Sequence, residues 1–348
     1  MIVKFHFIEA LRFITSIAVV VAHYQFFFYP RTSFSTLQVL SDPSMQPFFF
    51  FLQAFYIKGY YAVPIFWGIS GFIFALVYLE QTNKISGKKF FFNRFSRLYP
   101  LHFLTLIFVT VLQITNYYIL GTHQILENND ILRFVLHIFF VSGWEGESFN
   151  LPIWSVSVEI LIYFTFFISI VYLKKFGVKY AILIYTLATI TDKFLLSSLG
   201  LESSWFVDCF RLFFTGIIIY YLNLKIKEKK YLIPLSGLLI ALSFVGNFKI
   251  FIFTPGILLF FISLEYLIKS DKKKKLDVFG NLTYSMYLLH IPIMLSIILT
   301  IFLLGLPDTI FLNNIFFLSY LLSVLLLSYI SYRYYEKPLS KFIRKKIN

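Results

Sequence analysis

Long apolar runs recur along the whole chain, and they constrain its fold more than any other feature. A helix needs about 20 mainly apolar residues to cross the hydrocarbon core of a bilayer. Only 14% of the residues are charged, whereas soluble domains carry about 25%. We therefore predict an all-α polytopic membrane protein with about ten transmembrane helices, forming a single domain over residues 1–348. The predicted spans are 7–28, 61–79, 98–120, 151–173, 180–197, 205–223, 231–247, 250–268, 282–304 and 313–335.

The basic residues between these runs predict the orientation of the chain. With the N-terminus in the cytoplasm, most of the 31 Lys and Arg residues fall on the cytoplasmic side, as the positive-inside rule requires. Both termini are therefore expected in the cytoplasm. The net charge of +14 follows from topology, so no nucleic-acid partner is predicted.

The ends and connections of the spans carry further signals. The first run is long and contains Arg12 and His23, so it is read as a retained span and not as a cleaved signal peptide. The single cysteine, Cys209, excludes an intramolecular disulfide and is expected in the core. The Phe-rich stretch 46–52 is too short to span and is expected to be re-entrant or interfacial. The acidic outer segment 121–150 is read either as a cover over an acceptor site or as a solvated connection.

A polar stripe runs along the first span. Arg12 and His23 are eleven residues apart, which on an α-helix gives nearly the same azimuth and a separation of about 16 Å along the axis. Glu9 precedes Arg12 by three residues and joins the stripe. Ionisable groups inside a membrane are costly unless they line a polar cavity. These three residues are therefore candidates for a functional site.

A pair of arginines follows the second span. Arg94 and Arg97 are one helical turn apart and are expected to project together at the cytoplasmic surface. Paired guanidinium groups suit phosphate. Pro100 predicts a helix start nearby, whose N-terminal amides would add to anion binding. The alternative is that the arginines anchor the span beside anionic lipid.

Two serines and a glutamate lie at the outer end of the fourth span. Ser155 and Glu159 share a helix face, whereas Ser157 points elsewhere. Glu159 is expected at a depth comparable to that of His23, where a carboxylate could fix the tautomer of the imidazole and raise its basicity. The alternative is a polar pair that joins two helices.

The ninth span carries Tyr287 and His290 one turn apart, as a hydrogen-bonded structural pair or as part of a substrate channel. His290 is expected in the inner half of the membrane, nearer to Arg12 than to His23. In the second span, Gly71 and its small neighbours indicate close helix packing. The remaining histidines show no metal-ligand spacing, so no metal site is predicted.

Taken in order, these motifs resemble those of the membrane-bound acyltransferase 3 family, which includes bacterial O-acetyltransferases of lipopolysaccharide O-antigen, exopolysaccharide and capsule. The resemblance lies in six stretches, 8–23, 67–72, 94–100, 154–159, 284–290 and 336–338. The sequence departs from the family pattern at Glu9-Ala10, where Asp-Gly is usual, and at Phe13, where Gly is usual. Ile160 replaces a second glutamate, which removes the basis for a carboxylate pair beside Glu159.

The resemblance implies an O-acyltransferase that moves an acyl group, acetyl first among the candidates, from acyl-CoA to a hydroxyl of a cell-surface glycan or its lipid-linked precursor. It places the protein in the bacterial cytoplasmic (inner) membrane. CoA would be held by Arg12, Arg94 and Arg97. His23 would act as general base or transient acyl carrier, with Glu159 orienting it. The substrate or oxyanion candidates are Ser155, Ser157, Tyr287 and His290.

No soluble esterase-like domain of the SGNH type follows the tenth span, so the membrane domain is expected to complete the transfer itself or to pass the acyl group to a separate periplasmic protein. Two other classes stay open. A transporter or flippase of lipid-linked sugars would also need many spans, although it would often show internal repeats, which this sequence lacks. A noncatalytic membrane scaffold is the other alternative.

Overall fold

Every regular element of the described chain is a helix. The computed structural model describes residues 4–28, 42–81, 85–142, 148–196, 205–245, 249–268 and 271–346. Within these ranges, eight helices are long and apolar enough to cross a membrane. The all-α polytopic prediction is therefore confirmed. The eight are His6–Phe28, Phe49–Tyr78, Gly87–Leu120, Ile153–Phe176, Trp205–Lys225, Ile250–Leu267, Lys272–Leu303 and Asn314–Lys345.

Two of the ten predicted spans are not among these eight helices. The predicted span 180–197 coincides with α8 (Val178–Ile190), which continues as the π-helical η4 (Thr191–Leu196). The predicted span 231–247 coincides with α10 (Leu232–Ser243). A helix the length of α10 rises only about 18 Å, whereas the hydrocarbon core is about 30 Å thick.

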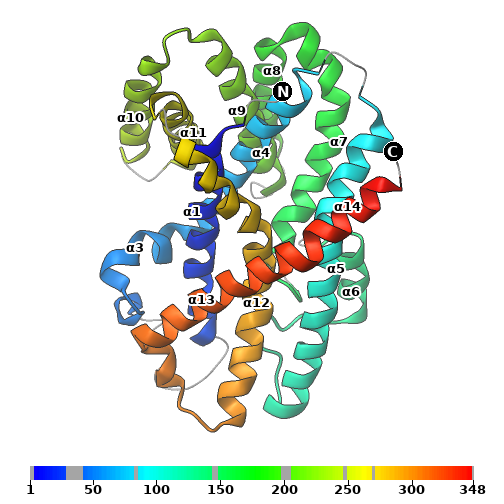
Figure 1. Cartoon of the computed structure of the whole chain (residues 1–348), viewed down its shortest axis with the longest axis vertical. Coiled ribbons are helices and arrows are strands. Elements are labelled where there is room, and N and C mark those ends of the chain that lie inside the picture. The colour runs from blue at the N-terminus through cyan, green and yellow to red at the C-terminus, as the bar shows by residue number, and fades with distance from the viewer. Residues whose placement is uncertain are drawn as a thin grey trace. The chain divides into compact units, whose positions relative to one another are not determined.

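The chain divides into two compact units. Unit 1 comprises Met1–Thr15, Tyr61–Gly87 and Val158–Gly280, and unit 2 comprises Ser16–Tyr60, Lys88–Ser157 and Asn281–Asn348. Three of the five divisions fall within the helices α1 (His6–His23), α7 (Ile153–Phe176) and α12 (Leu276–Leu303), and the other two fall within η3 (Gly59–Tyr61) and after the first residue of α5 (Gly87–Leu120). Figure 1 labels the elements along the chain. The assignment of residues 1–348 to a single domain stays a prediction.

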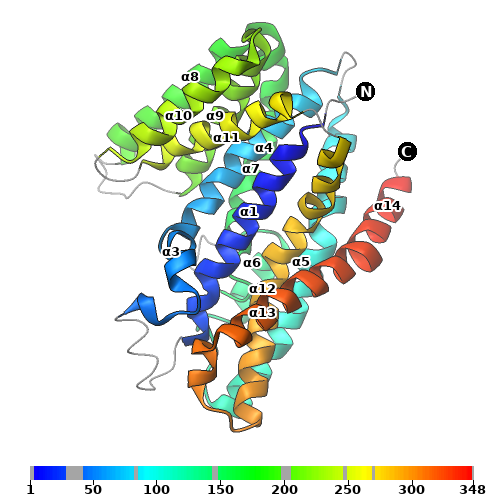
Figure 2. The same ribbon diagram turned by 60° about the vertical axis from the view of Figure 1, so that its left-hand side comes forward.

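Unit 1 is organised around the contact of α4 (Ala62–Tyr78) with α9 (Trp205–Lys225). A Cβ atom on Gly71 would lie 1.8 Å from the carbonyl oxygen of Phe213, and one on Gly216 would lie 2.0 Å from the carbonyl oxygen of Gly68. The two backbones therefore approach so closely that only glycine fits, which confirms the packing role predicted for Gly71. Cys209 is buried on α9, as expected. α10 packs beside α11 (Ile250–Leu267) (Figures 1 and 2).

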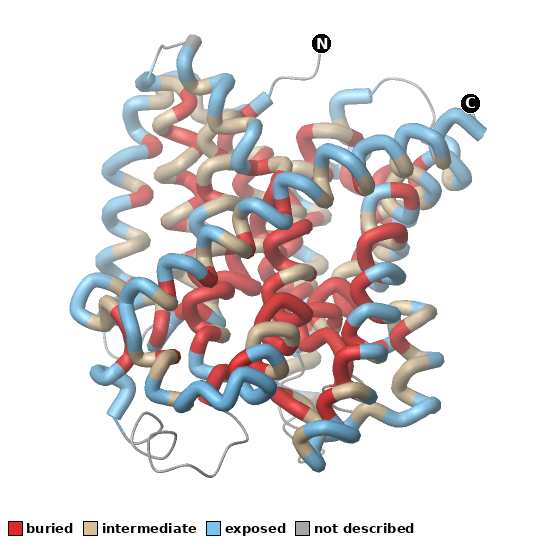
Figure 3. Tube along the Cα trace, turned by 60° about the horizontal axis from the view of Figure 1, so that its bottom comes forward, coloured by how far each residue is buried: buried red, intermediate tan, exposed pale blue. Residues whose placement is uncertain are grey.

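Unit 2 has an aromatic core that fixes the end of α1. Tyr24 opens the short η1 helix (Tyr24–Phe28), and its hydroxyl donates to the carbonyl of Phe311 at 2.8 Å. The ring of Tyr24 also packs against Phe317 and Tyr320 on α13 (Asn314–Ser331), and all three rings are buried (burial along the trace is coloured in Figure 3). His23 immediately precedes Tyr24, so this core holds its backbone in place.

The other helices of unit 2 are α3 (Phe49–Lys58), α5 (Gly87–Leu120, from Lys88 onward), α6 (Ile131–Ile138) and α14 (Lys337–Lys345). Figures 1 and 2 show α13, the π-helical η8 (Tyr332–Glu336) and α14 as one continuous helical segment. The remaining short helices of the two units are η2 (Pro43–Met45), η3 (Gly59–Tyr61), η5 (Lys229–Tyr231), η6 (Asp271–Lys275) and η7 (Asp308–Leu312).

The prediction of a helix start near Pro100 is wrong. α5 begins at Gly87 and continues through Pro100, so no set of free N-terminal amides exists there. Pro100 has no N–H to donate to the carbonyl of Ser96, four residues earlier, so the helix lacks one backbone bond at this turn. Two tyrosine hydroxyls bond to the neighbouring backbone: Tyr284 donates to the carbonyl of Leu98 at 2.6 Å, and Tyr335 donates to that of Pro100 at 3.1 Å.

The Phe-rich stretch forms the start of α3, with Phe50 85% and Phe51 79% exposed. In the outer segment 121–150, residues 121–142 and 148–150 are described and contain α6. Glu145 and Glu147, on which the predicted acidic cover partly rests, lie outside the described residues.

Candidate active site

Unit 2 contains most of the predicted site residues. Unit 1 contains only Arg12 and Glu159 of this set. Unit 2 contains the others, which are His23, Arg94, Arg97, Ser155, Ser157, Tyr287 and His290. Glu159 and His23 lie in different units, and their predicted pairing stays a prediction.

The structure joins two histidines of unit 2. The Nδ1 atom of His23 lies 2.8 Å from the Nε2 atom of His290, across 267 residues of sequence. The expectation that His290 lies nearer to Arg12 than to His23 is therefore wrong. The reason is the start of α12, which begins at Leu276 and not at residue 282, so His290 lies about 21 Å along the helix from its first residue.

The hydrogen bonds of this pair assign the tautomer of each ring. The Nδ1 atom of His290 lies 3.1 Å from the carbonyl oxygen of Met286. A carbonyl only accepts, so Nδ1 of His290 carries the proton, and Nε2 of the neutral ring is an acceptor. His23 then donates from Nδ1 to that acceptor, and its own Nε2 atom keeps a lone pair. His290 is fully buried and His23 is half-buried, so the basic nitrogen lies on the more accessible ring.

A tyrosine and a serine extend the site from the histidine pair. The ring of Tyr287 lies 6.3 Å, centroid to centroid, from that of His290. The Tyr287 hydroxyl lies 2.7 Å from Oγ of Ser155, which in turn donates to the carbonyl of Pro152 at 3.1 Å. A hydroxyl has one proton, so Tyr287 is the donor to Ser155. The first turn of α7 is thereby fixed against α12.

Ser157 has a different neighbour. Its Oγ atom donates to the carbonyl of Ile153 at 3.0 Å and lies 3.1 Å from Oγ of Ser142. Ser155 and Ser157 thus contact different elements, as the helical spacing predicts. Ser157 links α7 to the segment after α6.

Three buried side chains near this site were not predicted from the sequence. Asn150 donates to the Thr105 hydroxyl at 3.2 Å and to the carbonyl of Leu288 at 3.1 Å, two residues before His290. His102 donates from Nε2 to the carbonyl of His137 at 2.7 Å, and Nε2 of His137 lies 3.0 Å from the Ser148 hydroxyl. The position of Asn150 just before the 154–159 motif was the one available signal.

We expect acid to loosen α6 through His137. Burial, with a smaller contribution from the neighbouring His102, lowers the pKa of His137 to about 3, whereas an exposed histidine titrates near 6.5. When α6 opens locally, His137 becomes exposed and binds a proton more readily than in the closed state. The stability that neutral His137 gives to the closed state is therefore lost as the pH falls from about 6.5 towards 3. At pH 5 this corresponds to about 2 kcal/mol, or about 30-fold more frequent opening.

Hydrogen exchange of α6 peptides at pH 7.5 and pH 5, corrected for the intrinsic pH dependence, measures this effect. The α3 peptide, which lacks titratable side chains other than Tyr56 and Lys58, is the internal control. The variant His137→Asn should show a smaller pH dependence, since only the buried His102 imidazole beside α6 is then left to bind a proton. Equal protection of α6 at both pH values in the wild-type protein would contradict the prediction.

The two arginines of α5 lie against the end of the chain. Arg94 is half-buried and Arg97 is exposed. Arg97 interacts electrostatically with Glu336, a buried carboxylate that also accepts hydrogen bonds from Ser285 and Ser331. From α14, Arg344 donates to Oγ of Ser96 at 3.0 Å. Arg344 was not among the predicted site residues, because the basic residues of this tail indicate only topology in the sequence.

In unit 1, the predicted stripe residues of α1 form an ion pair. Arg12 donates to the Glu9 carboxylate at 2.8 Å. A Cβ atom on Gly280 would lie 1.9 Å from this carboxylate, so glycine at 280 makes room for Glu9. Glu159 interacts electrostatically with the buried Cys209.

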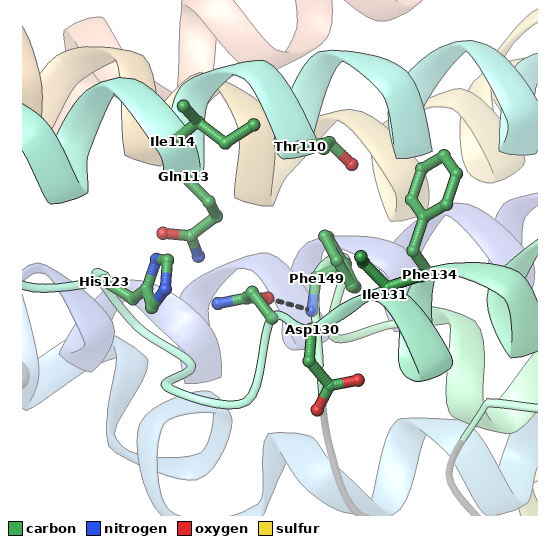
Figure 4. Close-up of a pocket in the computed structure, with 9 residues that line it drawn as sticks. Thr110, Gln113, Ile114, His123, Asp130, Ile131, Phe134 and Phe149 are labelled. Atoms are coloured by element: carbon green, nitrogen blue, oxygen red, sulfur yellow. Dashed lines mark hydrogen bonds between the residues drawn. The ribbon is translucent and has the colours of Figure 1, made fainter.

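A separate pocket of about 230 Å³ lies between α5 and α6, and its lining residues include none of the predicted site residues. The side-chain oxygen of Asn129 accepts from the Phe149 amide at 2.7 Å beside this pocket. Figure 4 shows Phe149 there, with Asp130 and Ile131 at the start of α6. Within the described ranges, no three His, Cys, Asp or Glu side chains gather in a way that could hold a metal ion. The pocket is lined by Thr110, Gln113, Ile114, His123, Asn129, Asp130, Ile131, Phe134 and Phe149.

Comparison with known proteins gives one match. Residues 5–333 match the family model of acyltransferase 3, which is described as an acyltransferase domain. No curated protein and no solved structure matches the chain. The match covers both histidines and both arginines of α5, and it ends before α14.

Proposed function

The chain belongs to the membrane-bound acyltransferase 3 family, and from this premise we propose that it moves an acyl group from acyl-CoA to a hydroxyl of a cell-surface glycan or its lipid-linked precursor. Acyl transfer follows from the family. The CoA donor, an acetyl group, the glycan acceptor and a bacterial cytoplasmic membrane are the proposed details. The observation that supports the proposal most directly is the hydrogen-bonded pair of His23 and His290.

The pair suits general base catalysis. Nε2 of His23 takes the proton of the acceptor hydroxyl while the oxygen attacks the thioester carbonyl. The C–S bond then breaks, the C–O bond is kept, and the CoA thiolate leaves with the proton from His23. Throughout, the bond from Nδ1 of His23 to His290 keeps the ring in one orientation and helps to carry the positive charge that forms on it. In a covalent route, His23 would instead hold the acyl group itself.

The other site residues have supporting roles in this proposal. Tyr287 and Ser155 already hydrogen-bond to each other, so one of them must turn to the substrate to stabilise an oxyanion. Ser157 orders the segment beside them. Arg94 and Arg97 are proposed to bind the phosphates of CoA, with Arg12 as a further CoA-binding residue and Glu159 as an orienting carboxylate.

The proposal is tested in the host by measuring ester-linked acyl groups on the surface polysaccharide. We expect these groups to disappear when the gene is deleted and to return with the wild-type gene. The same ester content in both strains would contradict a polysaccharide acceptor, and CoA release by the purified protein would then show whether acyl transfer itself is wrong. Movement of lipid-linked sugars in liposomes without acyl transfer would favour a flippase.

A further inference from the structure

The C-terminal helix α14 is bound to the stretch of α5 that carries the paired arginines. Arg344 donates from Nε to the buried Ser96 hydroxyl at 3.0 Å and from Nη2 to the carbonyl of Asn93 at 3.4 Å. Asn93 and Ser96 are the residues directly before Arg94 and Arg97. The guanidinium of Arg344 therefore lies next to the backbone of the predicted phosphate site, although it comes from a helix beyond the matched residues 5–333.

The segment before α14 fixes this arrangement. Glu336 is buried, accepts hydrogen bonds from Ser285 and Ser331, and interacts electrostatically with Arg97. The neighbouring Tyr335 hydroxyl donates to the carbonyl of Pro100 at 3.1 Å. Contacts at both ends of the 94–100 motif thus hold α14 against α5, and the position of Arg344 does not depend on a single surface contact.

The charge of this region is strongly positive. Residues 337–346 contain five basic side chains and no acidic one. Glu336 is the carboxylate that faces Arg97. A guanidinium presents five N–H donors in a rigid planar fork, which matches the oxygens of a phosphate group. Two of these donors explain the contacts of Arg344 with Asn93 and Ser96.

We propose that Arg344 is a third phosphate-binding guanidinium beside Arg94 and Arg97, so that the C-terminal helix completes the site for the phosphates of acyl-CoA. This inference rests on the proposed function. Coenzyme A carries a diphosphate and a separate 3′-phosphate, so several charged groups must be bound at once. An anionic lipid headgroup offers the same phosphate chemistry, and the experiment must separate these two sources.

The test is calorimetric titration of coenzyme A into the full-length protein in nanodiscs of uncharged phosphatidylcholine. The variant Arg344→Gln should weaken binding about 10- to 100-fold, as expected for the loss of hydrogen bonds to a charged group. The matched control Lys345→Gln removes one positive charge from the same helix and should change the affinity less than twofold. Arg344→Lys keeps the charge without the fork and should recover only part of the affinity.

Each other outcome overturns the inference in a distinct way. Equal losses in Arg344→Gln and Lys345→Gln would show a diffuse charge effect. Unchanged CoA affinity in Arg344→Gln, with fewer phosphatidylglycerol molecules retained in mixed nanodiscs by native mass spectrometry, would assign Arg344 to lipid. If the wild-type protein binds no CoA, the proposed donor fails and the inference fails with it. Melting curves of all variants, with Arg344→Lys as the milder change, establish that the proteins compared are folded.

Discussion

Replacing His23 with alanine is expected to lower acyl transfer by roughly 100- to 10,000-fold, the contribution typical of a general base. His23 donates its Nδ1–H to His290, so its Nε2 atom keeps a lone pair and can accept the proton of the acceptor hydroxyl. Alanine has no such group. Release of CoA thiol by the purified protein, with acceptor present, measures the effect. Immunoblots of membranes should show that the variant is inserted at the wild-type level.

Variants of His290 test whether the pair acts as a unit. His290→Gln offers a side-chain oxygen that could still accept from His23, whereas His290→Leu cannot accept, so the glutamine variant should keep more activity. The pH profile of transfer should also change in His290→Leu, which a purely structural role would not require. His123→Ala removes an imidazole elsewhere in unit 2 and is the control. Full activity of His23→Ala would contradict the mechanism.

Replacing Gly216 with valine is expected to prevent unit 1 from folding. The first added carbon would lie 2.0 Å from the Gly68 carbonyl oxygen and 2.7 Å from the Phe72 amide nitrogen. Both contacts are with backbone atoms, so no rotation of a side chain can relieve them. α4 and α9 would have to separate. We expect the free-energy cost of this separation to exceed the few kcal/mol that an overpacked side chain usually costs. Fluorescence-detected size-exclusion chromatography should show aggregated protein or none.

The matched control is Gly237→Ala on α10 of the same unit. A Cβ atom at this position meets nothing within 4 Å, and alanine favours a helix over glycine by about 0.5–1 kcal/mol. This variant should therefore melt at the wild-type temperature or slightly above it. A monodisperse Gly216→Val protein with a wild-type melting temperature would show that the two helices do not approach as the structure describes.

The membrane helices could be predicted from the sequence because hydropathy is a local property. The first span, predicted at 7–28, is found at His6–Phe28, and Gly71 was identified as a packing residue from its small neighbours alone. The predicted span 231–247 was longer than α10 because hydropathy does not show where a helix ends.

The contacts within the site depend on helix starts, which the sequence does not fix. α12 begins at Leu276, six residues before the predicted ninth span, and for this reason His290 was predicted near the wrong partner. Pro100 suggested a helix start because a proline inside a helix removes one backbone hydrogen bond and usually destabilises the helix. Tyr284 and Tyr335 are remote in sequence, and their bonds to the backbone around Pro100 could not be predicted from local spacing. The contacts of Arg344 with Asn93 and Ser96 likewise depend on the packing of α14 against α5, which local spacing does not show.

The separation of His23 and His290 by 267 residues also bears on how the protein is made. His23 is on the first span to enter the membrane, and His290 is on one of the last. At translation rates of 5–20 residues per second, His23 waits roughly 15–50 s for its partner. During this time its polar ring must be sheltered by water, by the insertion machinery or by other helices. Assembly of the histidine pair is therefore a late event of biosynthesis, and under the proposed mechanism a chain released before α12 is complete is inactive.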